Sequence, residues 1–318
     1  MSNLLPLSSG CVKMSTEPRL PSKKMLIQRL SIIGVGLIGG SLARALRRAG
    51  AVGEVVGCGR NTANLQKAID LGVIDHYHTN PVSAVQEADL VIVAVPLGTM
   101  APIFTAIRDA ISPEAIITDV GSAKATVVAA ARQHLGQHIP RFVPGHPIAG
   151  TEKSGVAASF AELFENRRVI LTPLPETDGS AHAKVTAMWK TTGAEVVDMS
   201  VEHHDEVLAA TSHLPHVLAY SLVDTLAKME TNSEIFRFAA GGFRDFTRIA
   251  SSDPRMWRDI CLSNRQAILQ VLEAFNTDLT QLAQAIQQGD AEQIENIFTR
   301  AKTARDLSNQ FLQNCQSR

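Results

Sequence analysis

A histidine between glycine and proline is the residue of this chain best suited to acid–base chemistry. His146 lies in Pro144-Gly145-His146-Pro147, and its flanking residues restrict the backbone, as in a loop that positions an active-site side chain. Because the pKa of histidine lies near neutrality, this side chain can accept the proton of an alcohol while a hydride leaves its carbon. A loop histidine satisfied only by backbone is the alternative that this local pattern leaves open.

A glycine-rich segment indicates a dinucleotide site. Gly34-Val35-Gly36-Leu37-Ile38-Gly39 follows a predicted strand and opens a predicted helix, which is the setting that gives GxGxxG its meaning. Gly34 permits the tight turn, Gly36 lets the backbone approach a pyrophosphate, and Gly39 lets helix and strand pack closely. The first helical N–H groups, around Leu37 and Ile38, supply a positive dipole end. The alternative is a tight turn without a ligand.

The end of the next predicted strand bears on the choice of cofactor. An enzyme that uses NAD usually carries Asp or Glu there to hold the ribose hydroxyls, but residues 56–62 contain no carboxylate. Arg60 could instead face a 2′-phosphate and Asn61 could donate a hydrogen bond, which mildly favours NADP over NAD. The alternative is that Arg60 stacks on adenine and NAD is used. Val95 and Pro96, at the end of a later strand, complete the predicted nucleotide site.

The second half of the chain contributes cationic and imidazole side chains. Arg248 could bind a substrate carboxylate in bidentate fashion, although Asp245 and Arg248, three residues apart, could equally form a helical ion pair. The spacing of His213 and His216, and the run of residues 202–206, would also suit a metal. The two histidines have no carboxylate nearby to complete a site, and the run 202–206 is better explained as a polar helix start whose acidic residues the helix dipole favours, so we expect no metal site.

Strand and helix patterns alternate over residues 29–198, which predicts an α/β domain with a parallel sheet covered on both faces. The predicted strands are Leu30–Ile33, Glu54–Cys58, Leu90–Val95, Ala115–Thr118, Arg141–Val143 and Val169–Thr172. The predicted helices between them are Ser41–Ala49, Ala63–Leu71, Met100–Asp109 and Lys124–Leu135. Residues 1–28 show no such pattern and are predicted to be a flexible tail.

After residue 200 the apolar spacing is that of helices alone. The predicted helices are His203–Ala227, Ser233–Ala239, Pro254–Gln287 and Ala291–Leu312, with a turn at Gly289-Asp290. Helices this long and apolar need partners, so residues 199–318 are expected to form a helical substrate and dimerisation domain that packs on its copy in a homodimer.

The composition excludes several classes of protein. The chain has 318 residues, 30 Lys and Arg against 31 Asp and Glu, and 45% hydrophobic residues, as in a soluble globular protein. Without basic clusters, neither a nucleic acid nor a membrane surface is expected as partner. No apolar run approaches the ~18–20 residues of a membrane span. The four cysteines lie far apart, which is typical of reduced thiols in a cytoplasmic protein.

Several segments in order resemble the prephenate/arogenate dehydrogenase (cyclohexadienyl dehydrogenase) family of tyrosine biosynthesis. They are GVGLIGGS, TDVGSAK, PGHPIAGTEKSG, TSHLPH and GGFRDFTRIASSDPRMW, and the resemblance runs from about residue 29 to 306. It implies a Rossmann-type dinucleotide-binding domain followed by an all-helical dimerisation domain. It also implies oxidative decarboxylation of prephenate to 4-hydroxyphenylpyruvate, of arogenate to tyrosine, or of both, with hydride transfer to NAD(P)+.

The resemblance also implies roles for residues of the reaction centre. His146 matches the base at the substrate 4-hydroxyl, and Ser122 the serine that orients the hydroxyl or the histidine. Arg248 matches the arginine that holds a substrate carboxylate. His216 matches a second pocket histidine near the substrate side chain.

Four further residues match positions at the margin of the family's site. Glu152 and Asp245 match acidic residues that form gating ion pairs at the mouth. Arg244 lies where members carry a basic residue near the side-chain end of the substrate, and Trp257 matches an aromatic that reaches the neighbouring subunit's active site.

Two other functions stay open at this point. A β-hydroxyacid or imine dehydrogenase of the same two-domain build would use a lysine early in the helical half, where Lys228 stands alone. A regulator that binds NAD(P) without catalysis would need neither a positioned His146 nor a clamp at Arg248.

Overall fold

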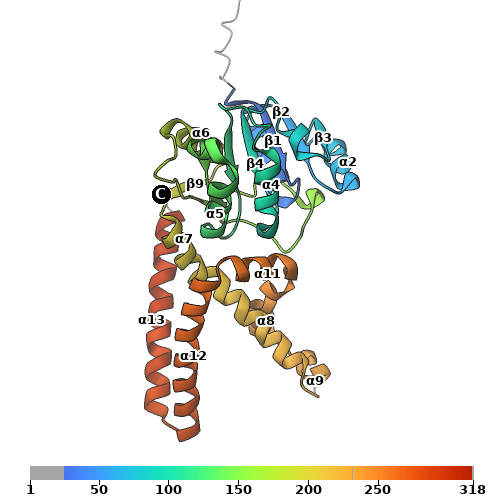
Figure 1. The fold of residues 1–318 in the computed structure, drawn as a ribbon. Helices are drawn as coiled ribbons and strands as arrows, with labels where there is room; N and C mark the ends of the chain where they lie inside the picture. The colour runs from blue at the N-terminus through green and yellow to red at the C-terminus, as the bar shows by residue number, and fades with distance from the viewer. Residues whose placement is uncertain (1–24, 231, 317–318) are drawn as a thin grey trace, which may run out of the picture.

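The computed structural model describes residues 25–230 and 232–316. An α/β domain forms one end of the molecule, and a wholly helical half hangs from it (Figure 1). The flexible tail predicted over residues 1–28 extends too far, because Ile27 is fully buried and pairs with Val52. Residues 1–24 lie outside the described part. Among the helices described, none is long and apolar enough to cross a membrane.

Six parallel strands form the main sheet, in the order β3-β2-β1-β4-β5-β6. This is the strand order of the Rossmann fold, and its direction reverses between β1 and β4, where such folds bind nucleotides. Runs of Val, Ile and Leu form the central strands because both of their faces are covered. The strands are β1 (Ile27–Ile33), β2 (Val52–Cys58), β3 (His76–His78), β4 (Leu90–Val93), β5 (Ile116–Asp119) and β6 (Phe142–Val143).

Helices cover both faces of this sheet, as the alternation predicts. One hydrophobic cluster joins the sheet to Leu42 and Trp189, and a second joins it to Phe104 and Val127. The helices of this domain are α1 (Leu37–Arg48), α2 (Thr62–Asp70), α3 (Pro81–Ala84), α4 (Met100–Ile107), α5 (Ala125–His134) and α6 (Gly179–Thr191).

A second sheet of three strands corrects two predictions. It consists of β7 (Gly145–Pro147), β8 (Arg168–Leu171) and β9 (Glu195–Asp198), with β7 antiparallel to β8. The predicted strand 169–172 therefore does not extend the main parallel sheet, and His146 lies in an edge strand opposite Ile170 rather than in a loop. Apolar patterning identifies a strand but not its partner, and β7 exists only because β8 lies beside it.

Two residues separate β9 from the first helix of the helical half. Its elements are α7 (Val201–Leu208), a π-helical turn (Ala209–His213), α8 (Leu214–Ala227), α9 (Asn232–Arg237), α10 (Gly241–Thr247), α11 (Pro254–Ser263), α12 (Arg265–Gln288) and α13 (Ala291–Gln316). The single helix predicted over 254–287 is wrong, because Asn264 leaves helical geometry between α11 and α12. Gly289, in the left-handed region with φ +67°, makes the predicted turn between α12 and α13.

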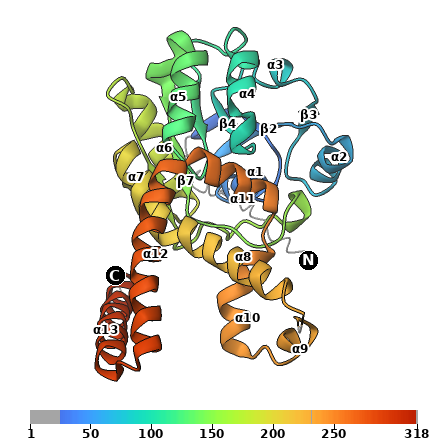
Figure 2. The ribbon, with the colours of Figure 1, turned by 60° about the horizontal axis from the view of Figure 1, so that its bottom comes forward.

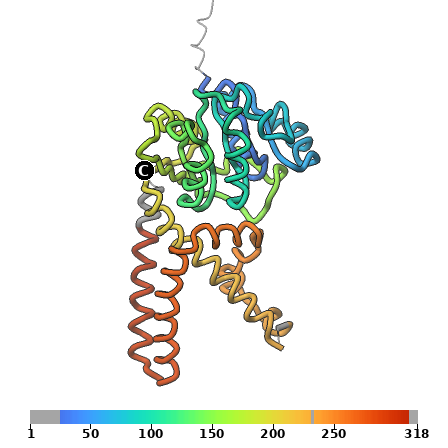
Figure 3. Tube along the Cα trace, in the orientation of Figure 1, coloured from blue at the N-terminus to red at the C-terminus, as the bar shows by residue number. Residues whose placement is uncertain are grey.

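The arrangement of the helices brings the carboxyl ends of the sheet strands toward the helical half. Helices α12 and α13 form a long hairpin, while α8 leaves the domain in another direction (Figures 1 and 3). Seen from below, α11 lies across the end of the α/β domain (Figure 2). It packs on the turn Leu97–Thr99 just beyond β4, so residues from both halves meet at this edge.

Candidate active site

The glycine turn between β1 and α1 has room for a ligand at one position only. Gly34 has φ +101°, and a Cβ there would lie 2.2 Å from the Ala94 carbonyl oxygen. A Cβ on Gly39 would lie 2.6 Å from the Gly34 carbonyl oxygen, whereas a Cβ on Gly36 would meet nothing within 4 Å. The open space at Gly36 and the tight contacts at the other two glycines fit a dinucleotide pyrophosphate.

The start of α1 offers the hydrogen-bond donors that a phosphate requires. No side chain caps this helix, and its first turn, which contains Leu37 and Ile38, has no acidic residue. A helix end of this kind leaves N–H groups available to an anion. Val95 lies against Gly34, and Pro96 follows it beyond the end of β4, so both predicted residues lie beside the turn.

The segment after β2 is tied to the glycine turn. Asn61 caps α2 by accepting a hydrogen bond from the Asn64 N–H, and the Asn64 amide donates to the Val35 carbonyl at 2.8 Å. Arg60 is exposed at the same edge, one residue before this cap. Arg60 and Asn61 therefore lie beside the glycine turn, where the ribose of a dinucleotide would lie.

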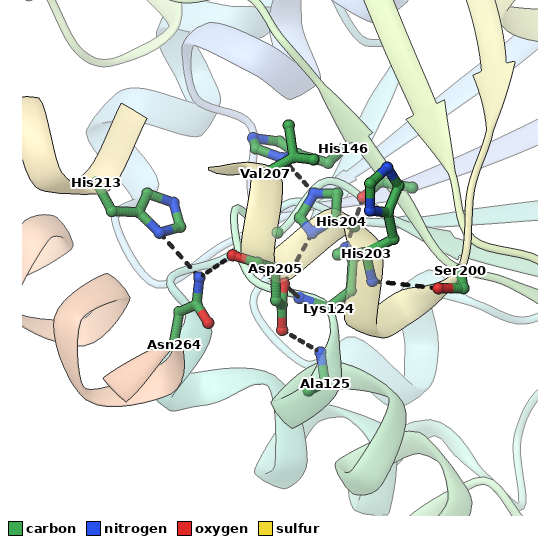
Figure 4. A network of polar contacts seen from close by, with 12 residues as sticks. Lys124, Ala125, His146, Ser200, His203, His204, Asp205, Val207, His213 and Asn264 are labelled. Carbon is green, nitrogen blue, oxygen red and sulfur yellow. Dashed lines mark hydrogen bonds and ion pairs between the residues drawn. The ribbon is translucent and has the colours of Figure 1, made fainter. Parts of the chain in front are cut away.

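His146 heads a buried chain of three side chains. Its Nδ1 lies 2.9 Å from Nε2 of His204, whose Nδ1 lies 2.7 Å from Oδ1 of Asp205 (Figure 4). The carboxylate also accepts hydrogen bonds from the backbone N–H groups of Lys124 and Ala125, where α5 begins. Strand β7 thus contributes the first histidine, and α7 contributes the other two residues.

Burial keeps His146 and His204 neutral. It lowers the pKa of His146 well below its ordinary value of 6.5, and electrostatic interactions with His204, Lys124 and His213 lower it further. Burial also lowers the pKa of His204, against the raising effect of Asp205. His146 is therefore an unprotonated base at neutral pH, as its proposed chemistry requires.

A buried ion pair fixes the backbone on which His146 stands. Lys124 Nζ donates to Asp119 Oδ2 at 2.5 Å and to the Gly145 carbonyl oxygen at 2.6 Å, and both side chains are wholly inaccessible to solvent. Asp119 Oδ1 accepts the Gly145 N–H at 3.2 Å. Because the N–H and C=O groups of Gly145 are both hydrogen-bonded to this ion pair, His146 cannot shift without breaking these hydrogen bonds.

A second polar connection joins the helical half to the loop after β5. The Asn264 amide donates to the Asp205 carbonyl oxygen at 2.8 Å and lies 3.1 Å from His213 Nδ1. His213 also hydrogen-bonds the backbone of Ser122, which is half-buried in that loop. Burial lowers the pKa of His213 to about 4. The structure thus places Ser122 next to the histidine cluster through its backbone.

His216 and Trp257 form the aromatic part of the site. Their rings are stacked with centroids 3.6 Å apart, and Trp257 also meets the edge of His213. Trp257 is buried, and no hydrogen-bond partner for its Nε1 lies among the residues that the structure describes. Its contacts are with its own chain; a contact with a neighbouring subunit stays a prediction.

The predicted mouth residues are exposed. Arg248 Nη1 lies 4.0 Å from Glu152 Oε2, so this ion pair joins the end of α10 to the segment after His146. The charge of Arg248 also acts on His216, whose pKa is lowered by burial first and by this arginine to a smaller extent. Arg244 and Asp245 are exposed on α10, and no hydrogen bond or ion pair among the described residues joins them to the histidines.

Sequence reasoning missed most of the polar network around His146. It interpreted 202–206 as a polar helix start, which is right for the exposed His203 but wrong for His204 and Asp205, both buried. Helical phase could have separated them, because residues 204 and 205 lie one turn before Leu208 and Ala209. Asp119 and Lys124 stood in a segment singled out from the sequence and His213 was considered only as a metal ligand, so none of the three was given its role in this network, and Asn264 was missed altogether.

Two further expectations concern metal and lysine. Within residues 25–230 and 232–316, no group of three or more His, Cys, Asp and Glu could hold a metal ion. Lys228 is exposed and pairs with Asp224 near the end of α8. It is not part of the histidine cluster, which disfavours a lysine-based dehydrogenase.

Two family models match the chain. The nucleotide-binding domain of prephenate dehydrogenase matches residues 42–198, and the dimerization domain of prephenate dehydrogenase matches residues 200–300.

Characterised relatives span nearly all of the chain. A cyclohexadienyl dehydrogenase of Zymomonas mobilis is 41% identical over 282 residues, which are 88% of this chain and 96% of that protein. The prephenate dehydrogenase from A. aeolicus, crystallised with hydroxyphenyl propionate and NAD+, is 40% identical; the match covers 89% of this chain and 99% of that one, with a TM-score of 0.83. A Synechocystis arogenate dehydrogenase is 27% identical, covers 88% of this chain and 100% of its own, and has a TM-score of 0.74.

Proposed function

Because the chain belongs to the prephenate dehydrogenase family, we propose that it oxidises and decarboxylates prephenate, arogenate or both in tyrosine biosynthesis. The observation that carries this proposal is the position of the buried His146, which follows Gly145 hydrogen-bonded to Asp119 at the carboxyl end of β5, in the same sheet whose strand β1 leads into the glycine turn. A base and a dinucleotide site at one edge suit an alcohol that loses a proton and a hydride together.

His146 acts first as a base and then as an acid. When bound, the nicotinamide supplies the acceptor for the hydride that leaves the ring carbon bearing the hydroxyl. His146 Nε2 takes the hydroxyl proton, the ring carboxylate departs as CO₂, and its bonding electron pair enters the ring. The same histidine then returns the proton to the oxygen, which leaves a phenol. Ser122 orients the hydroxyl or the imidazole.

Cationic side chains bind the substrate, which carries carboxylates. Arg248 is the proposed carboxylate clamp, with His216 and Arg244 toward the substrate side chain and Trp257 beneath His216. Arg248 Nη1 lies 4.0 Å from Glu152 Oε2, and a substrate carboxylate would replace Glu152 as partner of the guanidinium. Asp245 is proposed to take part in this exchange at the mouth.

For the cofactor, we propose NADP in preference to NAD. Arg60 and Asn61 stand where NAD enzymes carry an acidic residue, and a guanidinium can pair with a 2′-phosphate. Arg60→Ala should lower kcat/KM with NADP by about tenfold or more and leave kcat/KM with NAD nearly unchanged. The exposed Lys67 of α2 provides the control, as Lys67→Ala. Equal losses with both nucleotides would contradict the preference.

We further propose a homodimer that works in the cytoplasm. Helices α12 and α13 expose large apolar side chains, among them Leu269, Leu279, Ile286 and Phe298, and such a surface is typical of a subunit interface. Cys58 and Cys261 are free thiols, which suits a reducing compartment.

The direct test is reduction of NAD and NADP by the purified chain with prephenate, and in parallel with arogenate. We expect turnover with at least one substrate and its loss in His146→Asn, with dinucleotide binding retained because this side chain lies outside the glycine turn. His203→Asn, an exposed histidine on α7, should keep full activity. Tight dinucleotide binding without turnover on either substrate would instead indicate a regulator that binds NAD(P).

A further inference from the structure

We infer that His204 and Asp205 form a buried proton store behind His146, which holds the substrate's proton between its removal and its return. The inference rests on the proposed function and assigns His204 as a positioning residue, since it acts through His146. Three observations carry it: the order of the hydrogen bonds, the closure of the chain to solvent, and the structural anchoring of Asp205.

The hydrogen bonds can run in one direction only. The carboxylate of Asp205 already accepts two backbone N–H groups, so it also accepts from His204 Nδ1. A neutral His204 then has a bare Nε2, which must accept from His146 Nδ1 at 2.9 Å. A neutral His146 with its proton on Nδ1 has a bare Nε2, which is the lone pair that the reaction needs.

Proton uptake needs no movement of heavy atoms in the hydrogen-bonded row of His146, His204 and Asp205. When the substrate O–H bond breaks, His146 Nε2 gains the proton and its Nδ1 proton moves to His204 Nε2. His204 then carries the positive charge 2.7 Å from the Asp205 carboxylate, rather than leaving it on His146 near the cationic Lys124. When the ring electron pair reaches the oxygen, both protons move back. No proton is gained or lost by the protein over the cycle.

The far end of this hydrogen-bonded chain, at Asp205, is almost closed to solvent. The His204 side chain is 0% exposed and that of Asp205 is 8% exposed. A relay that exports protons needs an outlet to solvent, whereas a reaction that ends in a phenol needs the proton back. The Asp205 carboxylate also accepts hydrogen bonds from the backbone at the start of α5, which fix its position relative to His204 and His146.

Neighbouring His203 shows that this arrangement is specific to one position. It lies on the same helix, its side chain is 63% exposed, and its Nδ1 lies 4.0 Å from Glu206 Oε2. His203→Gln is therefore the matched control for His204→Gln. A glutamine at 204 can still accept from His146 Nδ1 through its Oε1, but it cannot hold a second proton.

The first measurement is the ¹⁵N spectrum of the histidine rings in the whole protein with NADP or NAD bound and without substrate. We expect His146 and His204 both protonated at Nδ1 and bare at Nε2 near neutral pH. A His146 protonated at Nε2 would overturn the inference, whether or not the protein turns over prephenate. This readout therefore separates failure of the proton store from failure of the proposed function.

The second measurement is steady-state kinetics of His204→Gln. We expect kcat to fall by about 10- to 100-fold, with KM for substrate and nucleotide within about twofold of wild type. His203→Gln should match wild type in every value. An unchanged kcat in His204→Gln would overturn the store, and so would a rise in KM alone, which a purely structural role would give. If His204→Gln fails to fold, the ring spectrum of the unaltered protein decides.

Discussion

Burial determines the charge of the histidines in the candidate site. His146 and His213 are almost inaccessible and His204 is wholly so, and burial is the largest cause of the lowered pKa of each. Neutral imidazoles, of which His204 contacts the Asp205 carboxylate and His146 contacts His204, make a site that can accept a proton at neutral pH. The same residues make the protein sensitive to acid, because unfolding exposes them to water.

The free energy of unfolding should therefore fall as the pH is lowered. His213 binds a proton below about 4 when folded but near 6.5 when unfolded, so between these values the unfolded chain binds more protons. The loss from His213 alone should reach about 3 kcal/mol once fully developed. Denaturant unfolding at about pH 7.5 and about pH 5 should already show about 2 kcal/mol of this loss. In His213→Gln the decrease should be smaller; an equal decrease would show that His213 is not the cause.

The exposed ion pair at the mouth predicts a defect in substrate binding. Arg248→Ala removes the proposed carboxylate clamp, so KM for prephenate should rise by about 30-fold or more while kcat changes less. Arg300, exposed on α13, is the control as Arg300→Ala. A fall in kcat with an unchanged KM would argue that Arg248 acts in the chemical step instead.

At the scale of elements, the ends of strands and the starts of helices assemble the site. The glycine turn joins β1 to α1, Asp119 ends β5, and His146 lies in β7. Helix α7 adds His204 and Asp205, and the break at Asn264 between α11 and α12 frees an amide that bonds α7. A residue that ends one element is thus also a hydrogen-bond partner of another.

The glycine turn predicts opposite outcomes for two substitutions. Gly36→Ala should leave the unfolding midpoint unchanged, since its Cβ meets nothing, yet weaken dinucleotide binding by about tenfold or more by filling the pyrophosphate space. Gly34→Ala should lower the midpoint, because its Cβ would collide with the Ala94 carbonyl. Gly179→Ala, at another open glycine, is the control. Thermal unfolding and nucleotide titration separate the two; normal binding by Gly36→Ala would count against this site.

At the scale of the whole molecule, the helical half of a single chain leaves large apolar side chains exposed. Its long hairpin turns Leu269, Leu279 and Ile286 toward one side of α12, each at least half exposed. The α/β domain, in contrast, encloses two clusters of buried side chains. This difference predicts association through the helices and not through the nucleotide-binding domain.

The assembly can be tested with one charge on that face. Leu279→Glu should shift the protein from dimer toward monomer in light scattering, since a buried unpaired carboxylate costs several kcal/mol. Gln284→Glu, exposed elsewhere on α12, adds the same charge and should remain dimeric. A wild-type chain that is monomeric at all concentrations would refute the homodimer.

The sequence by itself determined the class of fold, the glycine turn and the extent of the helical half, and it singled out His146 as the candidate base. These depend on local rules, namely apolar period, turn chemistry and the backbone limits of Gly and Pro, which neighbouring residues carry. Only the tertiary structure decided that His146 lies in a strand, that His204 and not His203 stands behind it, and that Asn264 interrupts a helix. Each of these depends on a partner far away in the chain: β8 for His146, and α5 and α11 for α7. Contacts at such separation leave no periodic signal in the sequence, since any residue of suitable chemistry could supply them.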